Sequence, residues 1–375
     1  MGLSFTRFLL IFLSGPALLA APAWGASEPA WQVEWKKTVE AANKEGQVNL
    51  YIFGGQSALP IESGVFQKRF PVINVVTVSG DPVPRILAER RAGKYLADVV
   101  IGGSSTPYDL YLVKALDSIR DAMILPEVVD ESKWWGGKHR YTDAERKYAL
   151  PFIGHPQAGG IYYNTRLVNP KEFRSFWDFL NPKWKGKIHS RDIRASGTGT
   201  VNARVFYYNP KVGPEFIRRL YSEMDVTLFR DRRQGVDWLV TGKFPVCFFC
   251  TRSDIGLAKR QGLPVEEFGP MKEGLGLTSS SGNMGLVNRA PHPNAAKVFI
   301  NWFLSREGQL TLQNEYAKAM VSASNSLRTD IPKDMVPPDQ RLVKGIDYIE
   351  VEIPERMSME PVLKIFNEAL AKVGK

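Results

Sequence analysis

Four segments rich in glycine and hydroxyl side chains could together bind a small anion. They lie at residues 54–57, 79–80, 102–105 and 195–200; three follow apolar runs and the fourth precedes a predicted helix. Glycine lets the backbone approach a ligand closely, and hydroxyls with free N–H groups at a helix N-terminus favour a negative charge. Each segment alone is better explained as a turn or helix cap, so the prediction rests on their convergence. The candidate ligand-binding residues in these segments are Gly55, Gln56, Ser57, Ser79, Gly103, Ser104, Ser105, Ser196, Gly197 and Thr198.

Arginines near the same segments could supply the opposite charge. A planar guanidinium can bind a carboxylate or a phosphate through two parallel hydrogen bonds. Most surface arginines have no such role, so we favour those close to predicted strand ends. The candidates considered are Arg191, Arg194, Arg230, Arg232, Arg233 and Arg252, of which Arg191, Arg232 and Arg252 are preferred, together with Ser253.

The two cysteines, Cys247 and Cys250, lie three residues apart in a segment whose composition predicts a strand. Residues at this spacing in a strand are ~10 Å apart and point to opposite faces. A disulfide needs Cα atoms within ~4.4–6.8 Å, so bonding would require the strand to end in a turn there. We therefore expect two buried thiols. A thioredoxin-like redox site shares the spacing, but the helix start and short domain of that class are missing.

An enzyme is the alternative from a different class, in the form of a secreted hydrolase. The sequence contains no Gly-x-Ser-x-Gly elbow, no His-Glu-x-x-His zinc helix and no Gly-x-x-x-x-Gly-Lys phosphate loop. The histidines are too dispersed to indicate a metal site: His139, His155, His189 and His292. We expect no catalytic residue, no metal and no cofactor.

The elements that must position these residues alternate between strands and helices, which predicts a mostly parallel sheet with helices on both faces. In such sheets, ligands bind at the carboxyl ends of the strands. We expect strands at residues 47–53, 72–78, 97–101, 148–152, 160–164, 187–189, 226–229, 246–249 and 283–288. We expect helices at residues 31–45, 60–70, 83–92, 176–180, 200–208, 212–224, 293–305 and 361–373.

The N-terminal segment has the layout of a secretory signal peptide, because Arg7 precedes an apolar stretch that ends in small residues. The stretch is interrupted by prolines and is shorter than the ~20 apolar residues of a spanning helix. We expect cleavage near Ala23, Gly25 or Ala26. No cysteine lies there to accept a lipid, so we expect a soluble mature protein in the periplasm.

Size and charge limit the remaining classes. The sequence has 375 residues and a formal net charge of +10, which becomes +9 when Arg7 leaves with the signal peptide. About 350 residues suffice for two domains, and the basic surface should attract anions. The basic residues are scattered and accompany no RNA-binding or zinc-finger motif, so we expect no nucleic-acid partner.

The order of these segments resembles the type II periplasmic solute-binding proteins of ABC transporters, in the branch containing ferric-ion-binding and phosphate-ester-binding proteins. The resembling segments span most of the mature chain, and each is weak alone. They are Val48-Asn-Leu-Tyr51, Gly54-Gly-Gln-Ser57, Ala97-Asp-Val-Val-Ile101, Gly160-Ile-Tyr-Tyr-Asn-Thr165, Asn181-Pro-Lys-Trp-Lys-Gly-Lys187, Ser196-Gly197 and residues 295–309. The resemblance implies an α/β fold of two lobes that close over a ligand about hinge strands.

The resemblance also implies a domain organisation and partners. We expect a signal peptide at residues 1–26, lobe 1 at 27–152 plus 283–330, lobe 2 at 153–282, and a C-terminal extension at 331–375. Hinge strands are expected within residues 152–164 and 268–286. The implied partners are a small anionic ligand and an inner-membrane ABC permease, and we expect a monomer.

Iron is the competing ligand within this family. The ferric-binding members place two adjacent tyrosines where this chain has Arg252-Ser253, and a histidine where it has Ser57. The acidic ligand expected near residues 103–105 is also missing. Fe(III) needs anionic oxygen donors, and an arginine cannot ligate it. The pair Tyr162-Tyr163 lies in a hinge-like strand, where core packing is the expected role. The resemblance therefore favours a small organic anion over iron.

Overall fold

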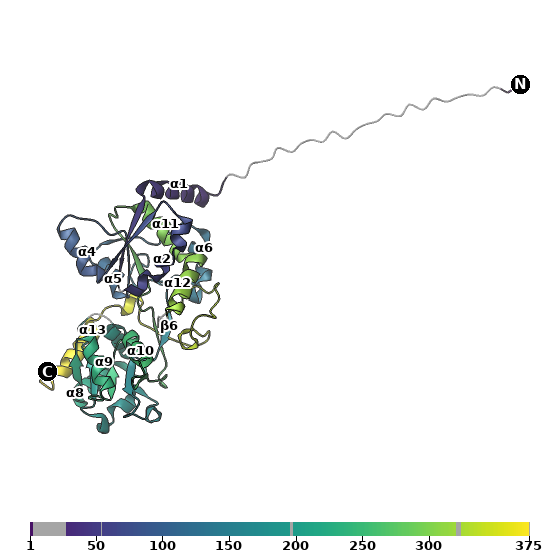
Figure 1. The fold of residues 1–375 in the computed structure, drawn as a ribbon. Coiled ribbons are helices and arrows are strands. Elements are labelled where there is room, and N and C mark those ends of the chain that lie inside the picture. The colour runs from purple at the N-terminus through teal and green to yellow at the C-terminus, as the bar shows by residue number, and fades with distance from the viewer. Residues whose placement is uncertain (3–27, 54, 196–197, 320–323, 375) are drawn as a thin grey trace.

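The structure, a computed structural model, describes residues 1–2, 28–53, 55–195, 198–319 and 324–374. The predicted signal peptide therefore lies outside the described residues except for Met1 and Gly2. Two lobes, each built on its own sheet, are joined by a short third sheet (Figure 1). Within the described ranges, no helix combines the length and the apolar character needed to cross a membrane.

The first lobe has a six-stranded sheet in the order β2-β1-β3-β13-β4, with β5 also paired to β13. β1 runs parallel to β2 and β3, whereas β13 is antiparallel to its neighbours. Its strands are β1 (Gln47–Ile52), β2 (Asn74–Ser79), β3 (Val99–Gly102), β4 (Leu116–Asp117), β5 (Ala149–Pro151) and β13 (Asn283–Val287). Its helices are α1 (Ala30–Glu45), η1 (Gly55–Ala58), α2 (Leu59–Glu62), α3 (Val65–Arg69), α4 (Pro82–Arg91), α5 (Ser105–Leu112), α6 (Pro126–Val129), η2 (Glu131–Lys133), η3 (Trp135–Gly137), α11 (Pro293–Leu304) and α12 (Arg306–Lys318).

The second lobe has a five-stranded sheet in the order β11-β7-β10-β8-β9, in which β10, β8 and β9 are parallel. Its strands are β7 (Ile161–Asn164), β8 (Ile188–Arg191), β9 (Thr227–Phe229), β10 (Val246–Phe248) and β11 (Val265–Glu267). Its helices are η4 (Pro170–Glu172), η5 (Phe176–Leu180), η6 (Pro182–Trp184), α7 (Thr198–Tyr208), α8 (Gly213–Glu223), α9 (Arg232–Val240) and α10 (Arg252–Arg260).

The hinge sheet pairs β12 (Gly276–Thr278) antiparallel to β6 (His155–Gln157) and parallel to β14 (Ile349–Glu350). β6 and β12 lie inside the two ranges predicted for hinge strands, and Figure 1 shows β6 between the lobes. The C-terminal residues add η7 (Pro338–Gln340), η8 (Pro354–Arg356) and α13 (Glu360–Ala371). The residue boundaries of the lobes stay a prediction.

Each sheet is covered by helices on both faces, as the alternation of elements predicts. In β1, Val48, Leu50 and Ile52 join the core cluster under α1 and α11, while Tyr51 faces the cluster of α4 and α5. In the second lobe, α13 contributes Phe366 to the core beneath α8. The predicted C-terminal helix therefore belongs to the second lobe's packing.

Local signals fix several of the element ends. α1 stops because Gly46 takes the left-handed conformation at φ 67°, as predicted. α4 starts where the Asp81 carboxylate accepts a hydrogen bond of 3.2 Å from the Val83 N–H. The single helix predicted over residues 60–70 is wrong, since Gly64 at φ 73° divides it into α2 and α3. The helices α5, α6, α9, α10 and α12 and the strands β4, β11 and β14 were not predicted.

Candidate functional site

The loops that leave the parallel strands of the first lobe lie side by side, because β1 pairs with both β2 and β3. Ser57 is buried in η1 and donates a hydrogen bond of 3.2 Å to the Phe53 carbonyl, whereas Ser79 is exposed at the end of β2. Gly55 and Gln56 also belong to η1, but the Gln56 side chain is outside the described atoms. These residues thus share one edge of the sheet.

The loop after β3 carries the other candidates of the first lobe. Gly103 and Ser104 follow the strand, and Ser105 is the first residue of α5. A Cβ atom at Gly103 would lie 3.7 Å from the Ser280 carbonyl oxygen, so this loop touches the chain that crosses from β12 to β13. Ser104 is buried at 3 % exposure. The contact joins the β3 loop to the hinge.

In the second lobe, three preferred candidates stand at ends of neighbouring elements. Arg191 ends β8, Arg232 begins α9 and Arg252 begins α10. Thr198 begins α7, while Ser196 and Gly197 lie outside the described residues. Because β8, β9 and β10 are parallel, these positions gather along one edge. A cation at a helix N-terminus faces the positive end of the helix dipole, so it needs a carboxylate nearby.

Most candidate arginines already have such a carboxylate within the chain. Arg232 binds Asp254 through two hydrogen bonds, of 3.0 and 2.8 Å. Arg194 and Arg230 both bind the buried Asp192, at 2.8 and 3.1 Å. Burial alone would raise the pKa of Asp192, but the hydrogen bonds from the two arginines hold it below its usual range. These guanidinium groups are therefore engaged in internal ion pairs.

Arg252 is the candidate arginine that reaches the hinge. Its Nε and Nη2 lie 3.1 and 3.0 Å from the same oxygen of Glu267, and Nη2 lies 3.7 Å from an Asp339 oxygen. Its Nη1 is 3.5 Å from Nδ1 of His155 on β6. Neighbouring Ser253 is exposed. Arg252 thus connects α10 of the second lobe to the hinge strand and to η7.

His155 continues this contact toward the first lobe. Its Nε2 lies 2.8 Å from the Ser280 hydroxyl, and Ser280 takes a left-handed backbone conformation at φ 49°. Burial, reinforced by the Arg252 charge, lowers the pKa of His155 to about 4, so the imidazole is neutral at neutral pH. Polar contacts therefore run from Ser280 through His155 to Arg252, and the Ser280 carbonyl lies beside Gly103 of the β3 loop.

A second arginine, Arg204, lies on the other side of residues 279–280, which connect β12 to β13. Sequence reasoning missed this arginine. It is buried at 3 % exposure on α7, and its Nη1 donates to the Met357 carbonyl at 2.6 Å. Burial lowers its pKa, which the nearby Glu352 carboxylate opposes. The available signal was that Arg204 is the one charged residue of α7, whose sequence is TGTVNARVFYY.

The carboxylate near Arg204 belongs to Glu352. No local sequence pattern indicates that Glu352 lies at the site. Its Oε2 accepts a hydrogen bond of 2.7 Å from the Ser279 N–H, and the Ser104 side chain lies nearby. Burial raises the pKa of Glu352, while this hydrogen bond and Arg204 oppose the rise. A carboxylate of the chain therefore accepts a backbone hydrogen bond beside the predicted anion-binding loop.

The C-terminal segment, defined as residues 338–359, supplies two carboxylates to the site, those of Asp339 and Glu352. Glu355 binds Arg146 of the first lobe at 2.8 Å, while Arg356 stacks over Tyr208 of the second lobe at 5.3 Å from the ring centre. Glu350 also pairs with Arg140. Figure 1 shows this segment in yellow as it passes between the lobes to α13. It therefore contacts both sides of the hinge.

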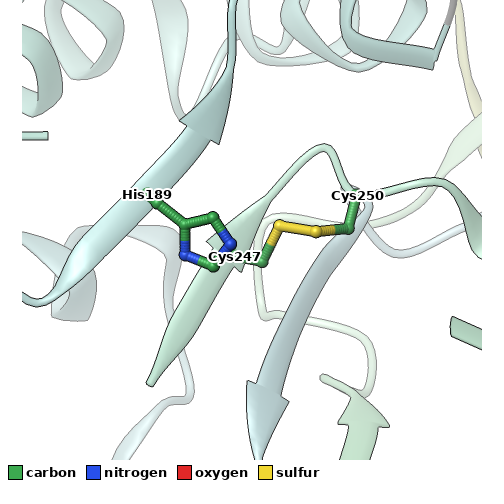
Figure 2. A group of neighbouring side chains, drawn as sticks. All are labelled: His189, Cys247 and Cys250. Carbon is green, nitrogen blue, oxygen red and sulfur yellow. A yellow bond between two sulfur atoms is a disulfide. The ribbon is translucent and has the colours of Figure 1, made fainter. Parts of the chain in front are cut away.

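The cysteines form a disulfide, which corrects the expectation of two thiols. β10 ends at Phe248, and Phe249 takes a left-handed conformation at φ 66° that turns the chain. The Cα atoms of Cys247 and Cys250 are therefore 6.0 Å apart, within reach of a disulfide. Figure 2 shows the disulfide beside the His189 ring of β8. These three buried residues lie within 4.8 Å of one another, but both sulfurs are bonded and offer no thiolate.

The remaining histidines and tyrosines have structural surroundings. His139 packs edge-on against Trp134, and the His292 Nδ1 is 2.9 Å from the buried Asp98 carboxylate. Tyr163 packs on Phe268 at 4.5 Å between ring centres, as core packing predicts. Tyr162 is buried on the opposite face of β7, in the core beside the disulfide.

Comparisons with known proteins agree with this architecture. An uncharacterized protein of Haemophilus influenzae is 28 % identical over 284 residues, which cover 72 % of this chain and 76 % of that relative. Iron-bound HitA from Pseudomonas aeruginosa is 16 % identical, with 86 % of this chain and 99 % of that chain covered and a TM-score of 0.60.

AfuA from Actinobacillus pleuropneumoniae, solved with fructose-6-phosphate, is 18 % identical, with 88 % and 99 % covered and a TM-score of 0.60. These likenesses establish the two-lobed fold of the periplasmic binding proteins. Residues 56–310 match the family model described as bacterial extracellular solute-binding protein. With two lobes joined by a hinge sheet and a match over more than half of its length, the chain belongs to the family of bacterial extracellular solute-binding proteins.

Proposed function

We propose that the protein is the periplasmic substrate-binding component of an ABC-type importer and captures a small organic anion by closure of its two lobes. The ligand carries a carboxylate or a phosphate group. The mature monomer, freed of its signal peptide, delivers the ligand to an inner-membrane permease. Membership of the solute-binding family supports the transport role, and the site geometry supports the ligand class.

One observation carries the ligand class: Arg252 and Arg204 stand on either side of the Ser279–Ser280 crossing, and each lies near a carboxylate of the C-terminal segment. The Glu352 carboxylate there accepts a hydrogen bond from the Ser279 N–H, and the Ser104 hydroxyl lies nearby. The same donors suit a ligand carboxylate or phosphate oxygen. A site that already holds an internal carboxylate has the donor geometry that an external anion needs.

The positive ends of three helices add to this preference. α5, α7 and α10 all begin at the carboxyl edges of the two sheets, next to the candidate residues Ser105, Thr198 and Arg252. Their free N–H groups favour a negative group held between the lobes. Closure then stabilises the liganded state by the ligand's higher affinity for the closed form.

Calorimetry on wild type, Arg252→Ala and Arg252→Lys tests this proposal. The probes are a panel of organic acids, phosphate esters, and Fe(III) with and without carbonate. We expect one class of organic anion to bind, and Arg252→Ala to weaken it by about 2–5 kcal/mol because the ligand charge stays buried and unpaired. Arg252→Lys should recover part of the loss, since an ammonium cannot form the two-pronged contact.

The matched control is Arg233→Ala, which removes an arginine of the same region that is 91 % exposed at its side chain. It should leave the affinity unchanged. Small-angle scattering should show compaction of the wild type on saturation. Tight Fe(III) binding that survives Arg252→Ala, with no affinity for any organic anion, would refute the ligand class. Turnover of a phosphate ester would instead reveal an enzyme.

A further inference from the structure

A separate cavity lies between residues 324–333 and the start of the C-terminal segment. Its volume is about 230 Å³. This is far more than the ~30 Å³ that one water molecule occupies in the liquid, and it is below the ~300–1,000 Å³ of a site for drug-sized ligands. Trp135, Leu327 and Leu342 form apolar parts of its wall, and Arg328, Lys333 and Arg341 add three cations. None of the predicted ligand-binding residues lines it.

Among the described residues, one of the three cations, Arg328, has a carboxylate within 4 Å. Arg328 is neutralised by Asp330, at 2.8 Å for both contacts, and by Glu127 at 3.3 Å. Lys333 donates to neutral oxygens only: the Gln313 side chain at 3.0 Å and the Ser326 carbonyl at 2.7 Å.

Arg341 likewise donates to the carbonyls of Val336 and Asp334, at 2.8 and 3.2 Å. Within the part of the chain that the structure describes, no carboxylate oxygen lies within the 4 Å of an ion pair from Lys333 or Arg341. Two positive charges therefore line one small cavity with no carboxylate in direct contact, and Asp330, which pairs with Arg328, acts on Lys333 only through its charge. Burial lowers the pKa of Lys333 to about 8, so the side chain keeps its proton at neutral pH despite poor solvation.

The cavity wall also holds a buried acceptor. Asn325 is 3 % exposed, and its Nδ2 donates to the Gly154 carbonyl at 2.8 Å. Its Oδ1 is buried and has no hydrogen-bond partner among the described atoms. An unsatisfied buried acceptor costs about 1–3 kcal/mol. A shift of the Asn325 side chain that brings its Oδ1 to a ligand hydroxyl in the cavity would therefore be favourable. The cavity wall is therefore complementary to a small molecule that carries both a negative group and a hydrogen-bond donor.

We propose that this cavity is a second ligand site, separate from the site between the lobes, for a small oxyanion that also carries a hydroxyl group. Lys333 and Arg341 bind the anionic oxygens, Asn325 accepts from the hydroxyl, and Trp135 and Leu342 cover the carbon skeleton. A hydroxy acid and hydrogen phosphate both have this chemistry. The site does not depend on the ligand proposed for the lobes.

Calorimetry on the intact mature chain with four probes separates the contribution of the ligand's charge from that of its hydroxyl groups. Glycerate has the carboxylate and the hydroxyls, propionate lacks the hydroxyl, glycerol lacks the charge, and inorganic phosphate is the alternative oxyanion. We expect glycerate or phosphate to bind at least tenfold more tightly than propionate, and glycerol not to bind. Tighter phosphate than glycerate would assign the site to the inorganic ion.

Variants connect the binding to this cavity. Arg341→Gln should weaken the preferred probe at least tenfold, and Leu342→Trp, which fills the cavity, should abolish its binding. Lys344→Gln, an exposed cation three residues further along, should have no effect. A melting temperature within a few degrees of wild type confirms that each variant folds.

Two results would overturn the proposal. One is the absence of heat from all four probes at millimolar concentration. The other is a probe whose binding is lost in Arg252→Ala and kept in both Arg341→Gln and Leu342→Trp. That probe would belong to the site between the lobes, so this inference would fail while the proposed function stood. Conversely, binding that depends on Arg341 alone would support the cavity even if no ligand of the lobes were found.

Discussion

The ion pair between Arg252 and Glu267 should stabilise the folded protein as well as shape the proposed ligand site. Arg252 contributes two nitrogens at 3.0 and 3.1 Å from one Glu267 oxygen, and the side chains are only 26 % and 19 % exposed. Removing one partner of a fully buried pair costs about 3–5 kcal/mol, since a charge is left buried and unpaired. Partial exposure lowers this, so we expect Arg252→Met to reduce the free energy of unfolding by about 3 kcal/mol.

The loss should depend on pH in a defined direction. Burial raises the pKa of Glu267 in the folded wild type, and the Arg252 charge opposes this rise. Without Arg252 the folded-state pKa of Glu267 rises further, so the folded variant holds its proton to higher pH. The cost of Arg252→Met is therefore complete above the variant's Glu267 pKa and is relieved as the pH falls below it.

Urea unfolding at pH 5 and pH 8 measures both effects. Glu267→Gln and the double variant complete a mutant cycle, in which the interaction energy should exceed about 1 kcal/mol. The matched control is the pair of Arg233 and Asp237, which lie 4.0 Å apart and are mostly exposed, and Arg233→Met should cost less than about 0.5 kcal/mol. Equal losses at both pH values, or additive single changes, would refute this account of the site.

Three further outcomes are expected. Burial lowers the pKa of His155 and His189 to about 4 in the folded protein, so the unfolded state binds more protons between about pH 4 and 6.5. The free energy of unfolding, measured in urea, should therefore rise with pH over that window. The variant His189→Gln should show a smaller rise. Replacing Cys247 and Cys250 by alanine should lower the free energy of unfolding by about 2 kcal/mol, the chain-entropy value for so short a loop, and an unchanged urea midpoint would contradict this. Asp339→Asn should tighten anion binding in calorimetry, because it removes a competing carboxylate from Arg252; weaker binding would show that Asp339 contacts the ligand.

Most strands and several of the longer helices could be predicted because their signals are local. Val48, Leu50 and Ile52 alternate with more polar residues, and Gly46 marks the end of the preceding helix. The short helices α9 and α10 could not be read in this way. Both begin with arginine, contain a glycine and bury only two or three residues, so their apolar stripe is too narrow to show a helical period.

The arginines of the candidate site illustrate a different limit. The sequence indicates Arg252 because it follows a strand, but its partners are distant in the chain: Glu267 lies on the paired strand β11, and Asp339 lies in η7. The same holds for Arg204 and Glu352. These pairs form across the fold and depend on how the hinge sheet positions the two lobes. No local sequence pattern encodes that arrangement.

The disulfide shows how one residue can decide a prediction. Strand geometry keeps residues three apart from bonding, and that argument holds for a continuous strand. Phe249 ends the strand by adopting a left-handed φ of 66°, a conformation that is uncommon outside glycine. Composition gives no warning of it, because a buried phenylalanine is typical of strands. The disulfide then fixes the turn that leads into α10 and Arg252.

The two carboxylates beside Arg252 are not equivalent for a ligand. Glu267 is largely buried, accepts two contacts at 3.0 and 3.1 Å from the guanidinium, and would be left as an unpaired charge if the ligand took its place. Asp339 lies at 3.7 Å and its side chain is 66 % exposed, so water can solvate it as soon as it moves away. An arriving anion should therefore displace Asp339 and keep Glu267. Arg252 thus remains paired in the absence of a ligand, and the side of the guanidinium toward η7 is the one that an external anion can reach at low cost.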